Sequence, residues 1–166
     1  DTPFMSRGSG ACVIFGKSGG VAEAASRTLY HVLTGKEVNN VPFKPSNHPH
    51  VYKEADMDEG GVKLKIAVVY GLANANKICD EVAAGTCDYN FIEVMTCPGG
   101  CIGGGGQPKD REYKGDALRA KRIEGLYKRD DSMQLRLSHE NPEIIKLYEE
   151  FYGEPLSELA EQMLHT

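Results

Sequence analysis

The sequence lacks the features that mark several common classes of protein. It has no run of about 18 apolar residues, so nothing in it is expected to span a bilayer. It has no excess of basic residues, and its formal net charge of −5 argues against a nucleic-acid or anionic-membrane surface. Its five cysteines are an odd number, which does not suit a secreted disulfide framework. Free thiols indicate a reducing compartment, so the cytoplasm is the expected location.

The start of the chain also lacks two features. No signal peptide is visible, and the first residue is Asp1 rather than methionine. This start suggests a cleaved product or a piece of a longer polypeptide. The length of 166 residues, with 40% hydrophobic and 26% charged residues, is typical of one soluble globular domain with a real core.

The most informative stretch is a short apolar run followed by two thiols among glycines. Residues 91–95 are expected to form a buried strand, and Cys97 and Cys101 follow it directly. Six glycines lie between residues 99 and 106. Glycine lets the backbone adopt a positive φ and approach another group closely, and its amides can point at anionic sulfur. The pattern therefore suggests a seat for a metal ion or an iron–sulfur cluster.

Two other interpretations of this stretch are weaker. A redox dithiol more often has the spacing C-x-x-C, which is one residue shorter than the spacing here. A phosphate-binding loop would need a lysine or serine after the glycines, and Gln107 and Pro108 follow instead. Residues 11–18 match a loose nucleotide-binding pattern, but the apolar residues 12–15 favour a buried strand over a phosphate cradle. Nucleotide binding at that position is rejected.

The remaining metal-binding side chains have simpler explanations. His48 and His50 are expected to be exposed loop residues, because no acidic or thiol companion lies near them in the sequence. Cys79 lies on the apolar stripe of a predicted helix, and Cys87 follows that helix. Both are expected to be small packed residues rather than ligands.

The string from Glu93 to Pro108 resembles the third cysteine motif of the iron-only hydrogenases, E-x-M-x-C-P-G-G-C-x-x-G-G-G-Q-P. This motif is long and specific. Further stretches along nearly the whole chain are similar to family patterns, namely Asp1–Phe4, Ser9–Gly16, Gly19–Ala25 and Ser138–Asn141. The resemblance implies that residues 1–166 are the C-terminal lobe of the two-lobed hydrogenase domain, whose catalytic cluster lies between the lobes.

In that family the cofactor joins a 4Fe–4S cluster, a cube, to a diiron subcluster that carries CO, cyanide and a bridging dithiolate. The reaction is the reversible conversion of two protons and two electrons into H₂. The resemblance implies that Cys97 binds only the cube and that Cys101 binds the cube and bridges to the diiron subcluster. Met95 corresponds to a methionine that lines the diiron site, and Phe15 is expected beside the same pocket. The resemblance gives Cys12 no role as a ligand. The glycines expected to stabilise charge on cluster sulfur are Gly99, Gly100, Gly103 and Gly104.

The resemblance also implies missing parts. A cube needs four protein ligands, and this motif supplies two. The motifs that carry the other two cysteine ligands are absent, so the chain is expected to be inactive alone. An N-terminal lobe, as a separate subunit or a cleaved part of the same hydrogenase, should supply them across an apolar face around Phe4, Phe15 and Met95. A ferredoxin-type or other electron carrier is the second expected partner.

The implied setting is anaerobic hydrogen metabolism in the cytoplasm, with the periplasm as the alternative location. Two other functions remain open. The chain can belong to a hydrogenase-like iron–sulfur assembly or H₂-sensing protein with little or no turnover, or it can be a purely structural lobe.

The periodicity of the sequence predicts an α/β fold with a layered, largely parallel sheet flanked by helices. Strands are expected at 11–15, 51–57, 62–70 and 91–95, the middle two as a hairpin. Helices are expected at 20–34, 74–84 and 115–128, from 142 to a stop at 153, and at 156–164. Ser18 is expected to cap the first helix, and the charges of helix 115–128 are expected to form a solvated face. The side chains expected to be buried in the first and fourth helices are Val21, Ala25, Leu29, Val32, Ile144, Ile145, Tyr148 and Phe151.

Overall fold

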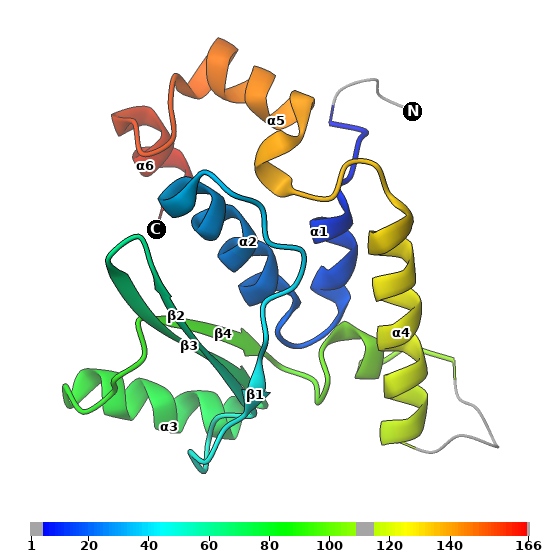
Figure 1. The fold of residues 1–166 in the computed structure, drawn as a ribbon. Coiled ribbons are helices and arrows are strands. Elements are labelled where there is room, and N and C mark those ends of the chain that lie inside the picture. The colour runs from blue at the N-terminus through cyan, green and yellow to red at the C-terminus, as the bar shows by residue number, and fades with distance from the viewer. Residues whose placement is uncertain (1–4, 109–114, 166) are drawn as a thin grey trace.

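The computed structural model describes residues 5–108 and 115–165, which contain a four-stranded mixed sheet in the order β1-β2-β3-β4 (Figure 1). The strands are β1 (Lys44–Pro45), β2 (Lys53–Glu59), β3 (Val62–Tyr70) and β4 (Phe91–Met95). The predicted hairpin is confirmed, because β2 and β3 pair in antiparallel register from Lys53 opposite Val68 to Glu59 opposite Val62. β4 pairs with β3 in parallel. The α/β class is therefore confirmed.

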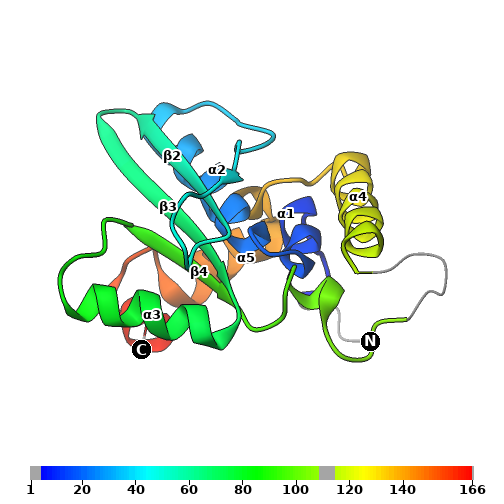
Figure 2. The ribbon, with the colours of Figure 1, turned by 90° about the horizontal axis from the view of Figure 1, so that it is seen from below.

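The sheet is mixed rather than largely parallel, because the strand predicted at 11–15 is helical. Helix α1 (Gly10–Val13) continues into a 3₁₀ turn, Ile14–Gly16. The amides of Gly10 and Ala11 donate to the carbonyls of Leu135 and Arg136, each at 2.8 Å. An apolar run of this length does not distinguish a buried strand from a buried helix, and here helices cover the segment. Figure 2 shows α1 between helix α2 (Gly20–Thr34) and helix α4 (Asp116–Ser132), away from the sheet.

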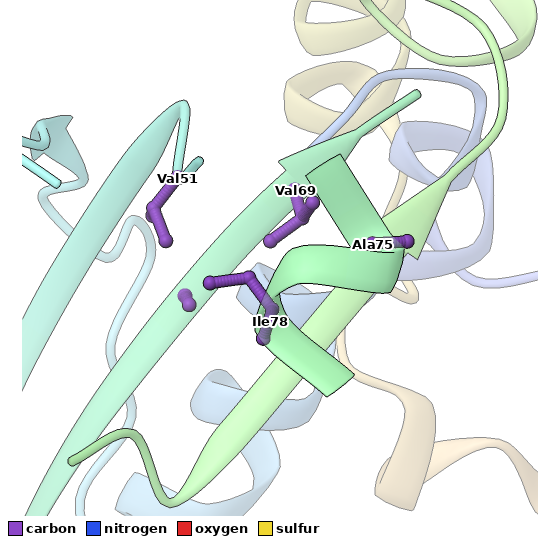
Figure 3. Packing of buried hydrophobic residues seen from close by; sticks show 5 residues of the cluster. Val51, Val69, Ala75 and Ile78 are labelled. Atoms are coloured by element: carbon purple, nitrogen blue, oxygen red, sulfur yellow. The ribbon is translucent and has the colours of Figure 1, made fainter. Parts of the chain in front are cut away.

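One face of the sheet is covered by helix α3 (Leu72–Ala83), which connects the parallel strands β3 and β4. Val51, Val69, Ala75 and Ile78 pack together there with Ala67 (Figure 3). The expectation that Cys79 is a packed residue is wrong, because its side chain is exposed on the outer side of α3. Cys87 is half-buried.

The other face is covered by helix α2 (Gly20–Thr34), which has the predicted bounds and ends at Gly35 with a φ of 67°. Its predicted apolar face is wrong, since Ala25 and Val32 are exposed and the buried positions include Glu23, Ser26 and Arg27. These charges are tolerated because they pair with one another and with α4, as described below. Hydrophobic periodicity does not detect a buried ionic face.

The C-terminal part adds a 3₁₀ turn (Ser138–Glu140), α5 (Pro142–Leu147), a π-helical turn (Tyr148–Tyr152) and α6 (Glu158–Leu164). The predicted start of α5 is confirmed, because the Asn141 side chain accepts from the Glu143 amide at 3.0 Å and Pro142 takes the first position. Ile145 and Phe151 are exposed rather than buried, because this segment lies at the periphery of the fold. No helix in the described ranges is long and apolar enough to cross a membrane.

Candidate functional site

The two motif cysteines lie on a tight turn directly after β4. Met95, the last residue of β4, accepts a hydrogen bond from the Gly71 amide at 2.8 Å. Cys97 is half-buried, and Cys101 is exposed at the start of a 3₁₀ turn, Cys101–Gly103. Both thiols are free. One turn therefore presents two thiols at the surface of the chain.

The glycines of this turn allow contacts that a side chain would prevent. Gly100 has a φ of 90°, and a Cβ atom there would lie 2.6 Å from the Ser18 nitrogen. A Cβ atom on Gly103 would lie 2.2 Å from the Pro98 oxygen, and one on Gly104 would lie 3.2 Å from the Cys101 carbonyl oxygen. The amides of Gly100, Gly103 and Gly104 donate to backbone carbonyls within the turn. The glycines thus keep the turn compact around the thiols.

The connection between α1 and α2 packs against the cysteine turn (Figure 1). The Ser18 amide donates to the Gly99 carbonyl at 2.9 Å, at the same place where Gly100 approaches the backbone of residues 16–18. Phe15 belongs to this connection, and the residue is 42% exposed. The structure therefore brings the segment that carries Phe15 against the turn that carries Cys97 and Cys101.

The sequence interpretation missed the part played by Glu93, the central residue of β4. Its side chain is buried, and its two oxygens accept from the amides of Gly19 at 2.6 Å and Ala22 at 2.7 Å. It caps α2 in place of Ser18, whose buried hydroxyl has no partner among the described residues. The sequence feature that could have revealed this role is a carboxylate at the centre of an apolar strand. Side chains two residues apart share a face, so Met95 also lies on the α2 side of β4.

A buried ionic cluster lies next to this connection, around Glu23. Glu23 of α2 pairs with Lys17 at 3.0 Å and with Arg27 at 2.8 Å, and the Tyr127 hydroxyl of α4 also donates to it. Burial lowers the pKa of Lys17, although the Glu23 carboxylate acts in the opposite direction. Burial and then the bond to Glu23 raise the pKa of Tyr127. The cluster joins the connection near the cysteine turn to α2 and α4.

Helix α4 also contacts the cysteine turn directly. The Arg122 guanidinium donates to the Ile102 carbonyl at 2.6 Å and also to the Pro108 carbonyl. Arg119 is half-buried, pairs with Asp116, and lies against Gly99. The expectation of a solvated basic face is therefore wrong for these two arginines, because they cover and hold the turn.

The other candidate ligands lie elsewhere or serve other contacts. Cys12 is an exposed thiol on α1. The expectation that the loop histidines are exposed is wrong, because both are half-buried. His48 contacts Glu81 at 3.2 Å, and His50 contacts Asn74 at 3.3 Å. Within residues 5–108 and 115–165, no three His, Cys, Asp or Glu side chains are grouped to hold a metal ion. Phe4, expected on the inter-lobe face, lies outside the described residues.

Comparisons with known proteins identify the family of the chain. Residues 1–105 match the family model described as the iron only hydrogenase large subunit, C-terminal domain. The chain belongs to the iron-only hydrogenase family. Residues 116–166 match a second model, the iron hydrogenase small subunit. The chain therefore contains segments matched by the models of two subunits of this family.

Individual relatives cover nearly the whole chain. It is 47% identical to the NADP-reducing hydrogenase subunit HndD of Solidesulfovibrio fructosivorans, over 100% of the chain and 28% of that relative. It is 37% identical to iron hydrogenase 1 of Clostridium pasteurianum, over 98% of the chain and 29% of the relative. A solved structure of the FeFe-hydrogenase HydA1 from Chlamydomonas reinhardtii matches with a TM-score of 0.69 and 36% identity, over 98% of this chain and 47% of that one. The chain spans less than a third of these curated relatives.

Proposed function

We propose that residues 1–166 are the C-terminal lobe of a hydrogenase catalytic domain that interconverts H₂ with two protons and two electrons. The observation that carries the proposal is the pair of free thiols on one glycine-enclosed turn, packed against the segment that carries Phe15. The 47% identity to a hydrogenase subunit over the whole chain supports the same function.

The two thiols of this turn fit the 4Fe–4S part of the cofactor of this family. Two thiols lie on one turn, Cys101 is exposed, and thiolates are the usual ligands of an iron–sulfur cube. We infer that Cys97 would ligate the cube and that Cys101 would ligate the cube and bridge to the diiron subcluster. When bound, the cube would supply electrons, and the diiron subcluster with CO, cyanide and dithiolate would supply the site of hydrogen chemistry.

The chain's own residues would position and shield this cofactor. The turn orients the two thiolates through hydrogen bonds such as that from the Gly104 amide to the Cys101 carbonyl at 3.0 Å. Met95 and Phe15 would cover the diiron subcluster with apolar surface and exclude water. Because Phe15 is 42% exposed here, the missing N-terminal lobe would complete this enclosure.

The missing lobe would also supply the other two cysteine ligands. In this proposal the chain is inactive alone, and a ferredoxin-type or other carrier delivers electrons to the assembled hydrogenase. The cytoplasm is the proposed location. The small share of each relative that the chain covers supports a protein with further parts.

A role in iron–sulfur assembly is the second candidate. The chain is 33% identical to the cytosolic Fe-S cluster assembly factor narfl of Xenopus tropicalis, over 91% of the chain. The lower identity favours the hydrogenase. An assembly protein would carry iron without the infrared bands of iron-bound CO and cyanide, so spectra of the complete protein separate the two functions.

Serine substitutions of the cysteines in the complete, matured protein test the proposal. A serine oxygen is a poor ligand for low-valent iron, so Cys101→Ser should abolish H₂ chemistry and the CO and cyanide bands. Cys97→Ser should first damage the cube seen by electron paramagnetic resonance. Cys79→Ser is the matched control, because Cys79 is an exposed thiol on α3, and this variant should retain both signals. CO and cyanide bands that persist in Cys101→Ser and disappear in Cys97→Ser would reverse the two roles.

A further inference from the structure

Glu93 is a buried carboxylate at the centre of a strand that is otherwise apolar. Glu93 is 6% exposed, and it lies two residues before Met95 and four residues before Cys97. A carboxylate removed from water is stable only when strong donors satisfy it. The groups that donate to this carboxylate therefore indicate which part of the fold it fixes in place.

The donors are two amides at the beginning of α2. Oε1 accepts from Gly19 at 2.6 Å, and Oε2 accepts from Ala22 at 2.7 Å. Because each oxygen binds a different amide, the carboxylate fixes both the position and the rotation of this first helical turn. The positive end of the helix dipole strengthens the contact. Gly19 has a φ of 89°, a left-handed conformation that favours glycine at the position where the backbone meets the carboxylate.

The same short segment is held to the cysteine turn from its other side. The Ser18 amide, one residue before Gly19, donates to the Gly99 carbonyl at 2.9 Å. A Cβ atom on Gly100 would meet the backbone of Lys17 and Ser18 at 2.8 and 2.6 Å. The segment 15–20 is thus bound at one end by the strand that leads into the cysteine turn and in its middle by the turn itself.

We propose that Glu93 is a positioning residue that sets the distance between the cysteine turn and the segment that carries Phe15. The inference rests on the proposed function for its catalytic consequence. Glu93 lies on β4, and β4 is paired to β3 through Ala67, Val68 and Val69, which are completely buried. It therefore transmits the fixed position of the sheet to segment 15–20, and through the Ser18 and Gly99 contact to the thiols.

The test uses Glu93→Gln in the complete hydrogenase of which this chain is part. The amide side chain keeps one acceptor and places an NH₂ group against a backbone amide, so one of the two bonds is lost. Glu54→Gln is the matched control, because Glu54 is a partly buried strand carboxylate on β2 whose partners are Ser46 and Tyr89. The first measurement is amide hydrogen exchange without the cofactor, which does not depend on the proposed function.

Glu93→Gln should accelerate exchange about tenfold in both segments, 16–23 and 97–104, whereas Glu54→Gln should leave them unchanged. Acceleration confined to 16–23 would show a simple helix cap and overturn the proposal. Glu93→Asp keeps the charge on a shorter side chain and should show the same pattern with a smaller change. Failure of both Glu93 variants to fold would also overturn the proposal, because Glu93 would then stabilise the whole lobe.

The second measurement uses the matured hydrogenase. Glu93→Gln should retain the iron content of the wild type, with shifted CO and cyanide infrared bands and turnover lowered about tenfold. Bands and turnover identical to those of Glu54→Gln would contradict the inference. A wild-type protein without these bands would contradict the proposed function instead, and the exchange experiment would still decide whether Glu93 couples the two segments.

Discussion

Arg27 of α2 and Asp130 of α4 form an ion pair of 2.9 Å whose side chains are 1% and 0% exposed. Arg27 lies in the part matched by the large-subunit model, and Asp130 lies in the part matched by the small-subunit model. Arg136 also donates to Asp130 at 2.7 Å. Burial alone would raise the pKa of Asp130, but the bonds from Arg136 and Arg27 hold this pKa below its ordinary value. The segments matched by the two models thus share one buried ionic centre.

Asp130→Ala should strongly destabilise the protein, because it leaves Arg27 buried without its partner on α4. The expected loss in the free energy of unfolding is about 3–5 kcal/mol, measured by denaturant titration. The adjacent Asp131→Ala is the control, since Asp131 pairs with Arg136 at 3.0 Å but is 61% exposed. Its loss should be below about 1 kcal/mol. A loss below about 1 kcal/mol for Asp130→Ala as well would show that the buried pair is not important for stability.

Stability should fall as the pH drops below about 6.5 through protonation of His139. Burial lowers the pKa of His139, and electrostatic repulsion from His31, whose ring centroid lies 4.4 Å away, adds to this, while Glu140 and Glu37 act in the opposite direction. The unfolded chain therefore binds the proton more tightly. The contribution of the neutral ring is complete above the unfolded pKa and is lost as the pH falls toward the lower folded value.

His139→Phe keeps an aromatic ring against His31 and removes this titration. The denaturation midpoint of the variant should change less than that of the wild type between roughly pH 7.5 and pH 5.5. This interval spans the ordinary histidine pKa. An unchanged slope would assign the pH dependence to other groups.

Gly100→Ala should disrupt the cysteine turn. Its φ of 90° and the distance of 2.6 Å from a Cβ atom to the Ser18 nitrogen leave no room for a side chain. We expect a loss of about 2 kcal/mol or more in the free energy of unfolding, together with poor iron incorporation. Gly105→Ala is the control, because nothing lies within 4 Å of a Cβ atom there, and it should be nearly neutral. Similar iron contents and stabilities would contradict the close approach at Gly100.

Met95→Leu should lower turnover while leaving the cube intact. Met95 is proposed to contact the cofactor without ligating it, and such contacts tune a site more than they hold it. The measurements are iron content and H₂ evolution of the complete matured hydrogenase. Met57→Leu, at a buried position of β2, is the matched substitution and should retain activity. Loss of the cube in Met95→Leu would give Met95 a structural role instead.

Local signals in the sequence determined several elements. Gly35 ends α2 where predicted, Asn141 and Pro142 start α5, and the pair Gly60 and Gly61 closes the hairpin. Each of these depends on the backbone preferences of one or two residues, which act regardless of the surrounding fold. The cysteine motif is equally local, because its thiols and glycines are neighbours in sequence.

Tertiary contacts decided the rest. Residues 10–16 are helical because α4 and the loop after it cover them, and α2 turns its ionic side inward because Asp130 lies opposite Arg27. The bond from Gly19 to Glu93 joins residues 74 positions apart in the chain. Hydrophobic periodicity records how often apolar residues recur, but it does not record which distant partner satisfies a buried charge. The sequence by itself therefore determined the thiol turn, and only the packing of α2, α4 and β4 decided what holds that turn in place.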